Sequence, residues 1–226
     1  MFEQNLIDHH IQKYIMQILI NTEYARYSAM RPEKTDSNLY SYHLKRLISS
    51  GYIEKSGNLY TLSTKGLRYV EYASSTSMKV RPQPKITTAA LLKDCTGRIL
   101  LTKRHRQPYI GYYGLPLGKI HTDRDISIKD SASRELYEKT GVSCENLSHV
   151  GDTYLRIYIN EILVSDILVH VFSAVCDRDL EINGTSLWAS RDDWGNIKLV
   201  PGAREIIESA ESSKGFFKEM SVWDKK

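Results

Sequence analysis

Two stretches in the second half of the chain decide its fold: residues 115–120 read LPLGKI, and residues 134–142 read RELYEKTGV. The first stretch predicts a loop, because its proline and glycine interrupt any regular helix or strand. The second belongs to a helical pattern that starts near residue 127, with Ala132 and Leu136 four positions apart. Gly141 follows the pattern, and glycine is common just beyond a helix end. We therefore predict a loop followed by a helix over about 127–140.

Segments with strand character flank this loop and helix. Residues 86–92 and 98–104 are rich in aliphatic side chains and enclose a turn at Gly97. Further strands are predicted over about 148–159 and 162–175, and a last helix over about 203–212. The second half of the chain therefore combines several strands with two helices.

The order and spacing of these residues resemble the box of the Nudix family, G-x5-E-x7-R-E-U-x-E-E-x-G-U, in which U is aliphatic. Gly118 matches the first glycine, and the second half of the box is matched in register by Arg134, Glu135, Leu136, Glu138, Gly141 and Val142. The resemblance covers roughly residues 84–213. It implies a mixed sheet between helices, with the box as a loop–helix–loop that holds Mg²⁺ for attack of water on a diphosphate.

The chain departs from the family pattern at the metal-binding positions. Carboxylates four apart on a helix share a face and can hold Mg²⁺ together, but the residue four after Glu135 is Lys139, which has no acceptor atom. The segment between Gly118 and Arg134 is two residues longer than in the box, and the upstream glutamate is missing. Glu135 is the clearest remaining metal ligand, and Glu138 and Asp125 are further candidates. If the chain is active, Glu135 and Glu138 are the candidate catalytic residues.

A second set of side chains is suited to a phosphorylated ligand. The basic run 103–106 follows the second strand and can meet phosphates, or it is a solvated strand end. Nearby tyrosines can stack on a base, or they pack under the loop. The predicted ligand-binding residues are Arg104, Arg106, Tyr113, Gly118, Lys119 and Lys139.

The first third of the chain has a different pattern. Helices are predicted over about 5–20, over about 23–30, and from the N-cap Asp36 to Gly51. Short strands at 52–55 and 59–62 enclose a turn at Gly57, and a closing helix follows over about 64–72. This order resembles the winged helix-turn-helix superfamily of DNA-binding domains. The stretch SYHLKRLISSGYI, residues 41–53, is similar to its recognition helix and first wing strand.

The resemblance implies that this third helix reads duplex DNA. The face of this helix opposite its apolar stripe presents hydrogen-bond donors, an aromatic ring and a cation. The wing adds a lysine. The predicted DNA-binding residues are Asn38, Ser41, Tyr42, Lys45, Arg46 and Lys55. The alternative is that these side chains are only the solvated side of an amphipathic helix. The distribution of charge favours DNA binding by the first third of the chain. Residues 1–82 carry eleven Lys/Arg and seven Asp/Glu, a net +4, whereas residues 83–226 carry twenty of each.

The length of 226 residues suits two small domains. Small polar residues and prolines between 73 and 84 predict a winged helix-turn-helix domain at 1–75, a linker at 76–84 and a Nudix-like domain at 85–226. The expected fold class is α+β: an N-terminal winged helix domain followed by a Nudix-type α/β/α sandwich with a mixed sheet. We expect a cytoplasmic protein without a membrane partner. The chain has no apolar run of bilayer length, no secretory signal and only three scattered cysteines.

These features predict a DNA-binding transcriptional regulator whose Nudix-like domain senses a nucleotide-linked small molecule. Its expected partners are double-stranded DNA, a nucleotide-derived small molecule, and a second copy of the chain, because such regulators read paired half-sites as homodimers. The alternative is a Mg²⁺-dependent Nudix hydrolase that cleaves a nucleoside diphosphate linked to another group, with Mg²⁺ as its cofactor. Lys139 in the box favours sensing over catalysis. A third possibility is an interaction protein in which neither domain performs its family's task.

Overall fold

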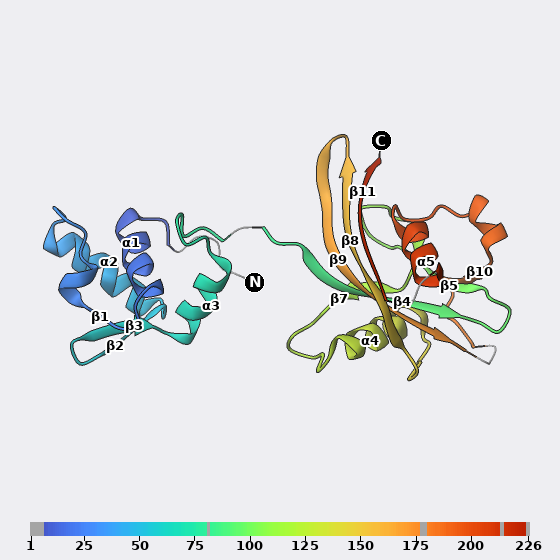
Figure 1. Cartoon of the computed structure of the whole chain (residues 1–226), viewed down its shortest axis with the longest axis horizontal. Coiled ribbons are helices and arrows are strands. Elements are labelled where there is room, and N and C mark those ends of the chain that lie inside the picture. Colours follow the sequence, from blue (N-terminus) through green and yellow to red (C-terminus); the bar gives the residue numbers. More distant parts are fainter. Residues whose placement is uncertain (1–6, 81, 177–179, 213–214, 225–226) are drawn as a thin grey trace. The chain divides into compact units, whose positions relative to one another are not determined.

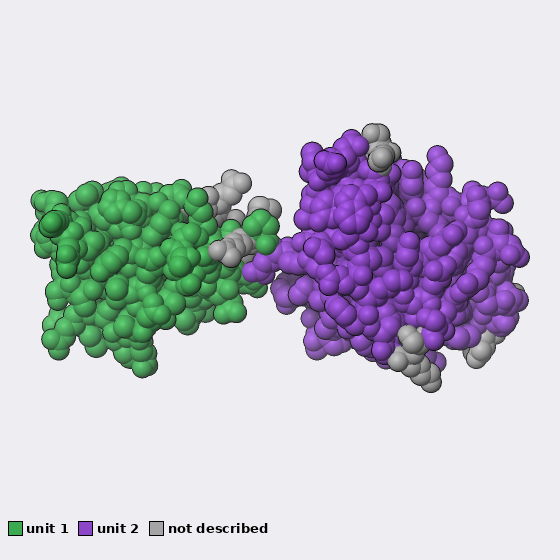
Figure 2. Space-filling view, turned by 45° about the horizontal axis from the view of Figure 1, so that its top comes forward, with its two compact units in different colours: residues 1–82 green, residues 83–226 purple. Residues whose placement is uncertain are grey.

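The computed structural model describes residues 7–80, 82–176, 180–212 and 215–224 (Figure 1). Residue contacts divide the chain into two compact units, Met1–Pro82 and Gln83–Lys226, which Figure 2 colours separately. Each unit has its own hydrophobic core. No helix among the described residues is both long enough and apolar enough to cross a membrane.

The first unit combines helices with a small antiparallel sheet. Its elements in chain order are α1 (His10–Ile20), β1 (Ala25–Arg26), the 3₁₀ helix η1 (Tyr27–Met30), α2 (Ser37–Ser49), β2 (Ile53–Ser56), β3 (Leu59–Leu62) and α3 (Thr64–Tyr72). Strand β3 lies between β1 and β2 and is antiparallel to both. Helices followed by the hairpin β2–β3 are consistent with the predicted wing.

Two boundaries in this unit differ from the prediction. The segment predicted as a helix over about 23–30 is a short strand followed by one 3₁₀ turn, because Ala25 and Arg26 pair with β3. The first helix starts at His10 rather than near residue 5. The side chain of His9 accepts a hydrogen bond from the backbone N–H of Ile11 and caps the helix there. Residues 5 and 6 of that predicted helix lie outside the described residues.

Part of the predicted linker 76–84 packs on the first unit. Met78 is fully buried in the core of this unit, and its carbonyl accepts a hydrogen bond from the hydroxyl of Tyr69. Ala73 and Val80 form an isolated bridge. One buried methionine thus attaches part of this segment of small polar residues to the core of the first unit.

The second unit is built on an eight-stranded mixed sheet. Its strands are β4 (Lys85–Lys93), β5 (Ile99–Lys103), β6 (Tyr113–Gly114), β7 (Leu117–Lys119), β8 (Ser148–Ile159), β9 (Ile162–Val175), β10 (Ser186–Ala189) and β11 (Phe216–Asp224). The order is β10-β5-β4-β9-β8-β11, with β6 paired to β5 and β7 paired to β4. The pairs β4–β9 and β8–β11 are parallel, and the other pairs are antiparallel.

Helices cover the two faces of this sheet. Helix α4 (Ile128–Thr140) buries Leu136 with Phe172 on one face, and helix α5 (Ala203–Ser212) buries Ile207 with Val169 on the other (Figure 1). A 3₁₀ helix, η2 (Arg191–Gly195), precedes α5. This is the α/β/α sandwich with a mixed sheet that the sequence predicts. The long hairpin β8–β9 and the last helix have the predicted bounds.

Candidate functional site

Helix α4 carries the residues of the box, and local signals position it. Ser127 caps the first turn: its Oγ accepts a hydrogen bond from the backbone N–H of Asp130. The carboxylate of Asp130 accepts one from the backbone N–H of Ser127, which completes a capping box. Gly141 ends the helix in the left-handed conformation, with φ of 78°. Leu136 is buried against the sheet. With both ends and one face fixed, the charged residues of α4 are held in a defined arrangement.

Arg134 is the centre of a charged cluster on this helix. Its Nε donates to Oδ1 of Asp125 at 2.8 Å, and its Nη2 donates to Oδ2 at 2.9 Å. Its Nη1 lies 2.9 Å from Oε1 of Glu135 and 3.3 Å from Oε2 of Glu138. The backbone N–H of His121 also donates to Asp125, at 2.7 Å. The hydrogen bonds from Arg134 hold the pKa of the Asp125 carboxyl well below its usual range.

Glu135 is buried, with 7% of its side chain exposed, and both of its oxygens face cations. Oε1 accepts from Arg134, and Oε2 lies 3.1 Å from Nζ of Lys139. Its carboxylate also lies so close to Gly118 that a Cβ at that position would be 2.0 Å from either oxygen. Glycine at 118 is thus required by the approach of Glu135.

The residues of this cluster do not fit a Mg²⁺ site. Mg²⁺ needs several oxygen ligands in near-octahedral geometry. Here Arg134 occupies both oxygens of Asp125, and cations occupy both oxygens of Glu135. Glu138 is half exposed, but one of its oxygens also lies against Arg134. An ion would have to displace these cations, so no catalytic step through Mg²⁺ follows from this arrangement.

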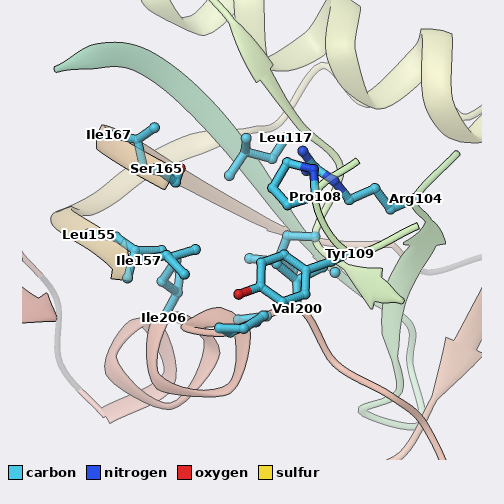
Figure 3. A pocket seen from close by; sticks show the side chains of 14 residues that line it. Arg104, Pro108, Tyr109, Leu117, Leu155, Ile157, Ser165, Ile167, Val200 and Ile206 are labelled. Carbon is cyan, nitrogen blue, oxygen red and sulfur yellow. The ribbon is translucent and has the colours of Figure 1, made fainter. Parts of the chain in front are cut away.

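A pocket opens on the other face of the sheet, beside α5. Its empty volume is about 620 Å³, including the mouth. In Figure 3, side chains from β8 and β9 lie on one side of it, and Arg104, Pro108 and Tyr109 lie on the other. Strand β7 separates this pocket from the charged cluster, because Leu117 lines the pocket while Gly118 faces Glu135. Most of its walls are apolar: Leu115, Leu117, Leu155, Ile157, Ile167, Val200 and Ile206.

Arg104 supplies the positive charge of the pocket. Its Nε donates to the carbonyl of Arg106 at 3.1 Å, which orients the guanidinium, and it has no carboxylate partner among the described residues. Burial, together with the nearby charge of Arg106, lowers the pKa of Arg104. Burial and the carboxylate of Asp224 raise the pKa of Tyr109 to about 12, so its hydroxyl stays protonated at neutral pH. The pocket thus offers apolar walls and an unneutralised cation.

The structure separates the other predicted ligand-binding residues. Gly118 and Lys139 belong to the charged cluster, and the carbonyl of Lys119 accepts a hydrogen bond from Arg134. The backbone of Tyr113 bonds to Lys198 and Val200. Of the predicted set, Arg104 alone lines the pocket. The apolar wall was missed, because the strand residues that form it are distant in sequence, and only the alternation at 155 and 157 in β8 could have indicated it.

In the first unit, the predicted DNA-binding residues lie on the solvated side of α2 and on the hairpin. Asn38, Tyr42, Lys45 and Arg46 are exposed on α2, and Lys55 is exposed on β2. Ser41 is half-buried, with its Oγ 2.9 Å from the hydroxyl of Tyr27. The opposite side of the helix is buried, through Tyr40, Leu44 and Leu47.

A family model described as "NUDIX domain" matches residues 83–209. This match spans more than half of the chain, and the chain belongs to the Nudix family. No curated protein matches the chain significantly.

Solved structures of Nudix proteins resemble the second unit at low sequence identity. The NUDIX domain of Shewanella oneidensis NrtR, solved with ADP ribose, is 19% identical, with a TM-score of 0.51 and coverage of 64% of this chain and 96% of that chain. A MutT protein from Bacillus halodurans is 20% identical, with a TM-score of 0.48 and coverage of 61% and 89%. S. oneidensis NrtR in complex with a 27mer DNA is 19% identical, with a TM-score of 0.45 and coverage of 55% and 59%. The first of these likenesses shows the shared Nudix fold.

Proposed function

We propose that this chain is a transcriptional regulator in which the first unit binds double-stranded DNA and the Nudix domain binds a nucleotide-linked small molecule without cleaving it. One observation carries the proposal: both oxygens of Glu135 are paired with cations, while a pocket on the other face of the sheet is open. This combination supports ligand binding over Mg²⁺-dependent cleavage.

The chemistry of the pocket supports a nucleotide-linked ligand. Apolar walls suit the faces of a base and a sugar, and most small-molecule sites combine such walls with a few polar groups. The guanidinium of Arg104 suits a phosphate or diphosphate, which it can bind through two parallel hydrogen bonds. ADP-ribose is a suitable first probe, because the NUDIX domain of S. oneidensis NrtR shares the fold and was solved with it.

The exposed face of α2 supports DNA binding. Asn38 and Tyr42 offer hydrogen-bonding groups to base edges, and Lys45 and Arg46 offer cations to phosphates. Winged-helix regulators that read paired half-sites do so as dimers, so we expect a homodimer. Light scattering on the purified chain tests this expectation, and a monomer at micromolar concentration would contradict it.

The proposal is tested by selecting duplexes from a random-sequence pool with the full chain. The affinity for a selected duplex is then measured by fluorescence anisotropy, with and without ADP-ribose. We expect a selected sequence to bind at least a thousandfold more tightly than random duplex, and ADP-ribose to change that affinity by about 5- to 150-fold. Arg104→Ala should keep the DNA affinity and lose the response to ligand. No selectable duplex would refute the proposal.

A Mg²⁺-dependent hydrolase remains the second candidate, and one observation favours it. The side chain of Glu138 is 50% exposed on the same helix, so one carboxylate of the box is open to solvent. Mg²⁺ would be the cofactor in that case, with Glu135 and Glu138 as ligands once Lys139 had moved. Metal-dependent loss of ADP-ribose or another nucleoside diphosphate derivative would establish this function instead.

A further inference from the structure

Three side chains form a cluster on the second unit that the box does not include. His149 and Asp152 lie on β8, and His170 lies on β9. Nε2 of His149 is 2.8 Å from Oδ1 of Asp152, and Nδ1 of His170 is 2.7 Å from the same oxygen. The three ligand atoms lie within 4.8 Å of one another. In the described part of the chain, no other three His, Cys, Asp or Glu side chains lie as close together.

A β-bulge builds this cluster. In a regular strand, residues 149 and 152 would point to opposite faces of the sheet. The pairing of β8 with β9 shifts between His149 and Gly151: His149 lies opposite Phe172, and Gly151 lies opposite Val171. The extra residue brings His149 onto the same face as Asp152, where its ring lies 5.4 Å from that of Phe172. The bulge therefore places on one face of the sheet two side chains that a regular strand would place on opposite faces.

Packing against the edge strand holds the bulge in place. A Cβ at Gly151 would lie 2.2 Å from the ring of Phe216, so the close approach of β11 requires glycine at this position. Phe216 pairs directly with Gly151 in the parallel ladder between β11 and β8. The geometry of the cluster is thus set by the sheet itself and not by an exposed loop.

The cluster is open to solvent and carries the charge that a cation needs. The exposed side-chain fractions are 20% for His170, 31% for Asp152 and 46% for His149. All three side chains are partly exposed, and their ligand atoms lie close together, so an ion can reach them from solvent.

We propose that His149, Asp152 and His170 bind one divalent transition-metal ion, with zinc as the preferred ion. Two imidazole nitrogens and one carboxylate oxygen form a donor set that zinc commonly takes from proteins, with a fourth position left for water or another ligand. Zinc–ligand bonds of about 2.0–2.2 Å place ligand atoms about 3.3 Å apart in a tetrahedron, so small rotations of the two rings open the cluster around an ion. The ion takes the place of the direct contacts that the two rings now make with Oδ1 of Asp152.

This site is distinct from the box. Asp152 pairs with His170 across β8 and β9, His170 pairs with Thr88 of β4, and Thr88 pairs with Gly118 of β7. Thr88 faces Ser131 of α4, with the two hydroxyl oxygens 3.3 Å apart, so the row lies on the α4 face. His170 is two strands away from Gly118, a separation of about 10 Å. Nitrogen donors also distinguish the site from Mg²⁺ sites, which are built from oxygen.

The test is metal binding by the full chain after treatment with a chelator. Zinc affinity and stoichiometry are measured by competition with a chromophoric chelator, and Co²⁺ is added separately to record its visible absorption. We expect one zinc per chain, and Co²⁺ bands of a four-coordinate site that zinc abolishes. His170→Ala, Asp152→Asn and His149→Gln should each weaken zinc binding by more than the about 10- to 100-fold that follows loss of a partner outside the coordination shell.

His105→Ala is the matched control, because His105 is an exposed histidine outside the cluster. It should leave the zinc affinity unchanged. His149→Gln guards against misfolding, since His149 is the most exposed member, and circular dichroism of each variant checks its fold. The proposal is overturned if wild type and His170→Ala bind zinc equally, or if His105→Ala loses as much affinity as the cluster variants.

Discussion

The Nζ atom of Lys139 lies 3.1 Å from Oε2 of Glu135, one helical turn away, where the family pattern has a second carboxylate. Glutamate followed by lysine four residues later is the favoured orientation for such a pair on a helix. Because Arg134 pairs with the other oxygen, Glu135 is held as an internal counter-ion. The central chemical difference from the family pattern is therefore the exchange of a metal ligand for a cation.

Restoring the carboxylate should restore part of the metal affinity. Lys139→Glu removes one cation from Glu135 and adds two acceptor oxygens on the same face of α4. We expect Mn²⁺, measured by electron paramagnetic resonance as a substitute for Mg²⁺, to bind at least tenfold more tightly, which corresponds to about 1.4 kcal/mol. Lys129→Glu on the same helix has the same charge change and should show no such gain. Equal affinities in the two variants would show that the geometry of the site has been lost as well.

The contact between Gly118 and Glu135 gives a stability prediction. Gly118→Ala should lower the free energy of unfolding by about 1–3 kcal/mol, because the added methyl group meets a carboxylate that two cations hold in place. In a Glu135→Ala background the same change should cost much less. Gly184→Ala is the control, since nothing lies within 4 Å of its Cβ position. Urea denaturation of the four chains of the double-mutant cycle measures the coupling, and a coupling near zero would contradict the described contact.

The exposed face of α2 gives a salt-dependence prediction. Lys45→Ala combined with Arg46→Ala should weaken DNA binding and reduce the slope of log K against log salt by about 2, because two phosphate contacts are lost. The pair Lys13→Ala and Lys79→Ala makes the same charge change outside α2 and should leave the slope nearly unchanged. If the two double variants behave alike, α2 is not the helix that contacts DNA.

Histidines in the first unit predict a loss of stability in acid. His43 is buried and stacks on His9 with ring centroids 3.8 Å apart. Burial lowers the pKa of both from 6.5, and neighbouring charges lower it further: His10 for His9, and His9, Arg46 and His10 for His43. The unfolded chain therefore binds protons more readily than the folded unit. The stabilisation is present above pH 6.5 and is lost as the pH falls below it.

Hydrogen–deuterium exchange of α1 and α2, corrected for the intrinsic rate, measures this loss between pH 7.5 and 5.5. Protection should fall with the pH in the wild-type chain and fall less in His43→Phe, which cannot be protonated. His105→Phe in the second unit should not alter the result. Protection that is independent of pH would contradict the assignment of neutral histidines in the folded unit.

Local patterns predict the long elements well, and they miss what depends on pairing. The 3.6-residue period locates α4 and α5, and end signals add to it at α4. Alternating apolar residues locate β8, and apolar runs locate β9. Strands β6 and β7 contain two and three residues, too few to show a period. Strand β11 was not predicted, because it is an edge strand with mixed exposure whose pairing with β8 comes only from the folded sheet.

In the candidate sites, too, the sequence predicts what is local to one element and misses what depends on how elements pack together. The box and the exchange at Lys139 are visible in the sequence because they are local to one helix. The apolar wall of the pocket joins Leu117, Leu155 and Ile206, which only the topology brings together. The cluster around Asp152 could not be predicted, because the odd spacing from His149 indicates opposite faces until the bulge is known.

The most direct measurement is mass spectrometry of ADP-ribose incubated with the full chain and Mg²⁺ or Mn²⁺, combined with calorimetry of its binding. We expect ADP-ribose, or another nucleotide of a small panel of dinucleotides, nucleotide sugars and nucleoside triphosphates, to bind and to be recovered intact. Arg104→Ala should weaken this binding at least tenfold. Metal-dependent cleavage by the wild-type chain would contradict the proposed function and would identify the protein as a working Nudix hydrolase.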